Sequence, residues 1–111
     1  MDQAAFEAAV RDAIESLPEE FQPALENVAV VVVEEPDPAD SAGEVLFGLY
    51  CGVPLNERGS GYSGLPDRVE IYRGPILRSF DAAHEIVAEI RDTLIHELGH
   101  HMGLSDDDMP Y

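Results

Sequence analysis

The 111-residue sequence has few basic side chains, a single cysteine and no long apolar run. Six basic residues, all of them arginine, stand against 23 acidic residues and leave a formal net charge of −17 at pH 7. Because phosphate contacts need a basic surface, this shortage argues against binding to nucleic acid or to an anionic membrane. Cys51 alone cannot form an internal disulfide, so nothing requires an oxidising compartment. No segment approaches the ~20 apolar residues that span a bilayer.

The N-terminal residues also lack the positive charge and the apolar stretch of a secretory signal. We therefore expect a cytoplasmic protein. Apolar residues make up 45% of the chain, which is too many for a disordered acidic tail. A chain of this length builds one hydrophobic core. Residues 1–111 are accordingly expected to form one domain.

Hydrophobic spacing predicts two helices and three strands. Periods of three and four predict amphipathic helices, whereas β-branched runs and alternation predict strands. A long segment rich in glycine, proline and serine, residues 54–67, is predicted to be a loop. Gly48 marks either a bulge or a close approach of two backbones, and the run 28–33 is typical of a strand covered on both faces. In chain order the predicted elements are a helix over 2–16, strands over 28–33, 44–51 and 68–73, and a helix from Ser79 or Asp81 to about Met102. This order predicts an α+β domain whose helices pack on a small twisted sheet.

The predicted C-terminal helix carries two histidines four residues apart, His96 and His100, with Glu97 between them. Residues at this spacing project from one face of a helix, one turn apart, so both imidazoles can reach one zinc ion. Glu97 flanks the same face and can take a proton from a water at the ion. The face lies opposite the apolar stripe of Leu94 and Leu98. The histidines are therefore expected to face a cleft or solvent.

A catalytic zinc usually has three protein ligands. Gly103 can adopt a left-handed conformation that turns the chain back toward the histidines, and a carboxylate then follows. Asp106 has the expected spacing, while Asp107 and Asp108 are alternatives. His101 points about 100° away from His100, which predicts either a supporting residue beside the site or a surface residue.

The run His96-Glu97-Leu98-Gly99-His100-His101-Met102-Gly103-Leu104-Ser105-Asp106 resembles the extended metzincin zinc-binding sequence, with aspartate in place of the third histidine. Over about residues 44–109 the chain resembles the small bacterial zincin-like metallopeptidases, or minimal zincins. Further parts of that resemblance are Phe47-Gly48-Leu49-Tyr50, Gly52-Val53-Pro54-Leu55, Pro66-Asp67-Arg68 and Ile71-Tyr72-Arg73-Gly74-Pro75-Ile76-Leu77.

The resemblance implies a minimal zincin fold, with an N-terminal helix and a long active-site helix on a small mixed sheet. It implies one catalytic Zn²⁺ held by His96, His100 and Asp106, with Glu97 as general base. Met109 would supply the methionine turn beneath the metal. An extended substrate would pair with a strand above the cleft, for which the candidate residues are Arg68, Val69, Glu70, Ile71, Tyr72 and Arg73.

Three functions follow as hypotheses. The first is a zinc-dependent peptidase acting on peptides or proteins, with a preference for basic ones because the acidic surface attracts cations. The second is a non-catalytic module, stabilised by a metal, whose acidic surface binds a partner protein. The third is a zinc hydrolase that acts on small amides.

Overall fold

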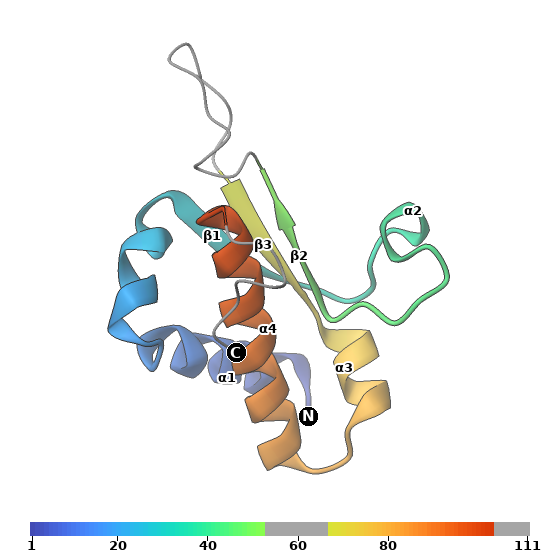
Figure 1. Ribbon diagram of the computed structural model, residues 1–111. Helices are drawn as coiled ribbons and strands as arrows, with labels where there is room; N and C mark the ends of the chain where they lie inside the picture. The colour runs from blue at the N-terminus through green and yellow to red at the C-terminus, as the bar shows by residue number, and fades with distance from the viewer. Residues whose placement is uncertain (53–66, 104–111) are drawn as a thin grey trace.

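The computed structural model describes residues 1–52 and 67–103, which form an α+β fold (Figure 1). Its sheet has three strands in the order β1-β3-β2, with β3 parallel to β1 and antiparallel to β2. The elements in chain order are α1 (Gln3–Glu15), the 3-10 helix η1 (Glu19–Asn27), β1 (Val28–Val33), α2 (Pro38–Ser41), β2 (Gly48–Cys51), β3 (Asp67–Tyr72), α3 (Arg73–Ser79) and α4 (Ala83–His101). The predicted α+β fold, in which an N-terminal helix and a long C-terminal helix pack with a small mixed sheet, is confirmed.

The N-terminal helix α1 is the one predicted from apolar spacing. Asp2 caps it, since its Oδ1 accepts a hydrogen bond from the Ala5 N–H at 2.8 Å. The helix buries one stripe, made of Phe6, Ala9, Val10 and Ala13, and packs against α4. Beyond Pro18 the chain continues as η1, which the sequence did not predict because Pro23 lies inside it.

Strand β1 corrects one expectation. Its valine-rich sequence predicted a strand covered on both faces, but one of its faces is largely exposed. Within the described sheet β1 is also an edge strand that pairs with β3 alone. Its exposure alternates, and Val31 remains 37% exposed. The strand buried between two neighbours is instead β3, where Val69, Ile71 and Tyr72 are all buried.

Strand β2 is shorter than predicted and begins at Gly48. This glycine lies where β2, β3 and α4 meet. A Cβ at this position would lie 2.5 Å from Thr93 Cγ2 and 2.9 Å from the Glu70 carbonyl oxygen. The predicted close approach at Gly48 is confirmed, and it lets the strand lie directly against α4.

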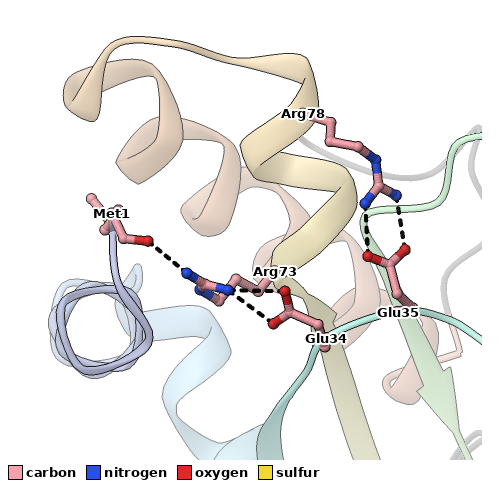
Figure 2. Close-up of polar contacts among 5 residues, drawn as sticks. All are labelled: Met1, Glu34, Glu35, Arg73 and Arg78. Atoms are coloured by element: carbon pink, nitrogen blue, oxygen red, sulfur yellow. Dashed lines mark hydrogen bonds and ion pairs between the residues drawn. The ribbon is translucent and has the colours of Figure 1, made fainter.

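Strand β3 ends at Tyr72, just before Gly74 and Pro75 as predicted, but the chain then forms α3 rather than a turn. Proline is tolerated in the first helical turn because its missing N–H has no partner there. Two arginines of α3 bind the segment after β1 (Figure 2). Arg78 forms a two-bond pair with Glu35 at 2.7 and 2.8 Å, and Arg73 bonds to both Glu34 and the Met1 carbonyl oxygen.

Helix α4 crosses the sheet in front of β3 (Figure 1) and contacts α1, β2 and β3. Its N-cap is Ala82 rather than Ser79 or Asp81, and the Glu85 carboxylate accepts a hydrogen bond from the Ala82 N–H at 3.3 Å. The helix stops as predicted at Met102, where Gly103 has a left-handed φ of 90°. No helix in the described part of the chain is long and apolar enough to cross a membrane.

The core-facing stripe of α4 differs in one residue from the predicted stripe. Leu94, Leu98 and Ile90 are buried as expected, but Val87 is 43% exposed and Ile86 takes its place. The stripe still leaves His96 and His100 on another side of the helix, where both are half-buried.

Candidate metal centre

The imidazole rings of His96 and His100 converge beside the last turns of α4. Their Nε2 atoms lie 3.1 Å apart, and the two rings are almost perpendicular at 86°. Two nitrogens bound to one tetrahedral zinc ion, each at ~2.0–2.1 Å, are roughly 3.3 Å apart. The spacing of the two imidazoles therefore fits a shared zinc ion, as the sequence predicted.

Glu97 completes a cluster of three groups that could hold a metal. The ligand atoms of His96, Glu97 and His100 all lie within 4.8 Å of one another. Glu97 Oε1 accepts a hydrogen bond from the Tyr50 backbone N–H at 2.8 Å. The Tyr72 N–H donates to the Phe47 carbonyl oxygen, and along an antiparallel strand the backbone N–H groups point alternately toward and away from the partner strand. The Tyr50 N–H, three residues after Phe47, therefore points away from β3. The outer edge of β2 thus orients the carboxylate.

A cleft of about 340 Å³ opens beside His96 and Glu97, between the start of β2 and α4. Two more acidic residues of α4, Glu89 and Asp92, line it, and the Thr93 hydroxyl donates to Glu89 at 2.8 Å. Among the described residues that line it, none is an arginine. The cleft is therefore electronegative and suits a cation, whether a metal ion or a basic side chain.

A buried polar cluster includes His101, the residue that follows His100 in α4. Asp67 Oδ2 accepts hydrogen bonds from the Tyr50 hydroxyl at 2.7 Å and from His101 Nδ1 at 2.6 Å. Asp67 and His101 are each 2% exposed, and the Tyr50 ring packs edge-on against the His101 ring at 5.6 Å. His101 is therefore buried, so the surface alternative is wrong, and its role as a supporting residue beside the site stays a prediction. Sequence reasoning missed Asp67 and Tyr50, because a single Asp at the end of a glycine-rich segment has no distinguishing pattern.

The third ligand remains a prediction. Asp106, its alternatives Asp107 and Asp108, and Met109 lie outside the described residues, as does most of the predicted loop over 54–67. Helix α4 ends at His101, and Gly103 has the left-handed φ on which the ligand prediction depends.

The predicted substrate strand is wrong. Residues Arg68 to Tyr72 belong to β3, whose backbone is paired with β1 on one side and β2 on the other, and Arg73 already belongs to α3. A central strand has no edge to offer an extended peptide. In the described sheet, the outer edge that lies beside Glu97 belongs to β2.

Comparisons with known proteins agree with this geometry. A family model described as "Zincin-like metallopeptidase" matches residues 25–111. A solved structure, a conserved hypothetical protein from Thermus thermophilus, is similar at a TM-score of 0.63 and 28% identity, over 92% of this chain and 94% of that chain. A search of curated proteins gives no match.

Proposed function

The chain belongs to the zincin-like metallopeptidase family, and from that premise we propose that it is a zinc-dependent peptide hydrolase with Glu97 as general base. The observation that carries the proposal is the convergence of His96, Glu97 and His100 at the edge of an open acidic cleft. A structural zinc site is normally closed by four protein ligands, whereas a catalytic site keeps one position open.

His96 and His100 would hold the ion, with Asp106 as the third ligand. When bound, zinc would polarise the scissile carbonyl and lower the pKa of a water at the site. The donor set, two imidazoles and a carboxylate, is one that zinc accepts in hydrolytic enzymes.

Glu97 would take a proton from the attacking water and pass it to the leaving amine. The hydrogen bond from the Tyr50 N–H holds one carboxylate oxygen, so the group is oriented before substrate arrives. Glu97 also lines the cleft, which supports this role because a peptide bound in the cleft would lie beside its carboxylate.

The substrate would lie along the outer edge of β2 near Gly48, which lines the same cleft. Backbone hydrogen bonds to this edge would hold an extended chain. Glu89 and Asp92 would favour basic side chains beside the scissile bond.

The test is the Glu97→Gln variant, assayed against a broad peptide library with mass spectrometric detection. Loss of a general base typically lowers the rate by about 10²- to 10⁴-fold, while zinc content should stay at the parent level. Glu70→Gln is the matched control, because Glu70 is a half-buried carboxylate whose partners, Arg68 and Tyr72, lie on the sheet face away from α4. Full activity of Glu97→Gln on every substrate of the parent would refute the mechanism.

A hydrolase of small amides is the second candidate, favoured by the size of the cleft. Its 340 Å³ lies near the lower end of the roughly 300–1,000 Å³ typical of small-molecule sites. Cleavage of short acyl amides but not of extended peptides would select this function. Bound zinc with no cleavage of either class would favour the non-catalytic interaction module.

A further inference from the structure

Tyr50 makes two hydrogen bonds in opposite directions, and both bear on the candidate centre. Its hydroxyl donates to the buried Asp67 carboxylate, and its backbone N–H donates to Glu97. The two bonds belong to one residue of a four-residue edge strand. Where the side chain is anchored therefore helps to determine where the N–H lies.

Asp67 joins this strand to the end of α4. The same oxygen that accepts from Tyr50 also accepts from His101, which directly follows His100 in the helix. A carboxylate that is only 2% exposed is costly to bury unless it is hydrogen-bonded, so Asp67 strongly favours the arrangement in which both donors reach it.

The surroundings keep this cluster compact. A Cβ at Gly52 would run into the Asp67 carboxylate and lie 2.9 Å from the Tyr50 hydroxyl oxygen. Tyr50 pairs with Val69, and Asp67, Val69 and Ile71 alternate onto the sheet face that packs on α4. The cluster thus fills the space between β2, the start of β3 and the last turn of α4.

We propose that Asp67, through Tyr50 and His101, is a positioning residue that fixes the Glu97 carboxylate relative to the histidine pair. This inference rests on the proposed function for its catalytic consequence. Without the anchor, β2 would be held by its pairing with β3 alone, so the Tyr50 N–H would be held less firmly at Glu97. Catalysis would then be slowed while the metal ligands stayed intact.

The experiment compares Tyr50→Phe with Tyr72→Phe. Both substitutions remove a tyrosine hydroxyl that donates to a carboxylate at 2.7 or 2.8 Å, but Tyr72 binds Glu70 on the sheet face away from α4. Hydrogen exchange of the residue-50 amide reports the bond to Glu97 directly and needs neither metal nor substrate. Zinc content, kcat and KM are measured on the same samples.

In Tyr50→Phe we expect the residue-50 amide to exchange at least about tenfold faster, while the Tyr72 amide, which donates to the Phe47 carbonyl oxygen, keeps its parent rate. The kcat should fall on the order of tenfold with KM and zinc content unchanged, because a misplaced base affects the transition state rather than binding. Tyr72→Phe should leave the residue-50 amide and kcat at parent values.

Unchanged exchange of the residue-50 amide in Tyr50→Phe would overturn the inference, as would faster exchange with an unchanged kcat. Equal effects of Tyr50→Phe and Tyr72→Phe would also overturn it, since they would indicate general destabilisation. A parent protein that cleaves no peptide or amide would instead refute the proposed function. The exchange measurement would still decide whether Asp67 holds the strand at Glu97.

Discussion

At the scale of single residues, buried polar groups distinguish the region around the centre from the rest of the core. Asp67 is the one fully buried carboxylate among the described residues, and it serves two donors at once. Such a group is stabilising only while its partners are present. Its removal therefore has a predictable effect on folding, separate from any effect on catalysis.

Asp67→Ala should lower the free energy of unfolding by about 2–4 kcal/mol, because the Tyr50 hydroxyl and His101 lose their common acceptor inside the core. Urea unfolding followed by circular dichroism measures the change. Glu35→Ala, which breaks an exposed pair with Arg78, should cost far less. Equal losses in the two variants would contradict the assignment of Asp67 as a buried anchor.

Cys51 offers a second test at this scale because it is the only thiol. Its side chain is half-buried in the structure. Burial, followed by the nearby Glu70, raises the pKa of the thiol above its ordinary value. The thiolate is the reactive form, so a raised pKa means less of it at neutral pH.

Alkylation of Cys51 by iodoacetamide should accordingly be slower in the folded protein than in urea, and its rate should still be rising above about pH 8.5. The rate constant as a function of pH, with and without urea, provides the measurement. A folded protein that reacts faster than the unfolded chain at neutral pH would show that the thiol is activated instead.

At the scale of elements, the approach of β2 to α4 controls the cleft. Gly48 permits contact with Thr93 and with the β3 backbone, and both Gly48 and Thr93 line the cleft. A side chain at residue 48 would have to displace the strand or the helix. The outer edge of β2 and the position of Glu97 depend on the same contact.

Gly48→Ala should destabilise the protein by roughly 1–3 kcal/mol, the usual cost of forcing extra atoms into a packed interface. Gly43→Ala is a useful contrast, because a Cβ at Gly43 meets nothing within 4 Å and only its φ of +82° is strained. Thermal unfolding of both variants gives the comparison. A fully stable Gly48→Ala would mean that β2 and α4 lie further apart than described.

The elements also show where sequence patterns were informative. Helices α1 and α4 were predicted within a few residues, because three- and four-residue spacing and the stop at Gly103 are local signals. The positions of His96, Glu97 and His100 followed from the same helical geometry. The strand order could not be predicted in this way, because alternation along residues 68–73 predicts a strand but not whether that strand lies at an edge or in the centre of the sheet.

The hydrogen bonds around the centre could not be predicted because they join residues far apart in the sequence. The partner of His101 lies 34 residues away, and the Tyr50 N–H that orients Glu97 lies 47 residues away. Nothing in the local pattern indicates such a pairing. Helix α3 was missed for another reason, since Gly74 and Pro75 usually end structure, whereas here they occupy the first turn of a helix.

At the scale of the whole molecule, the charge of −17 is the dominant property. The acidic side chains Glu89 and Asp92 bring that potential into the cleft beside Glu97. Attraction of a cationic substrate by such a field acts mainly on association and weakens as salt screens it.

If the protein cleaves peptides, kcat/KM should be higher for basic than for acidic peptides of equal length at low salt, and the ratio should approach one as salt increases. Initial rates with a matched pair of fluorogenic peptides provide the measurement, and uncharged peptides serve as the control. A ratio that is independent of salt would indicate that specificity comes from direct contacts instead.

The most direct test of the central claim is the metal content of the purified protein, measured beside single alanine variants of His96, His100, Asp106, Asp107 and Asp108. We predict one zinc ion per chain in the parent, loss of zinc in the His96→Ala, His100→Ala and Asp106→Ala variants, and retention in the other two. A parent protein that binds no divalent metal, or histidine variants that keep a full complement of zinc, would contradict the proposed centre.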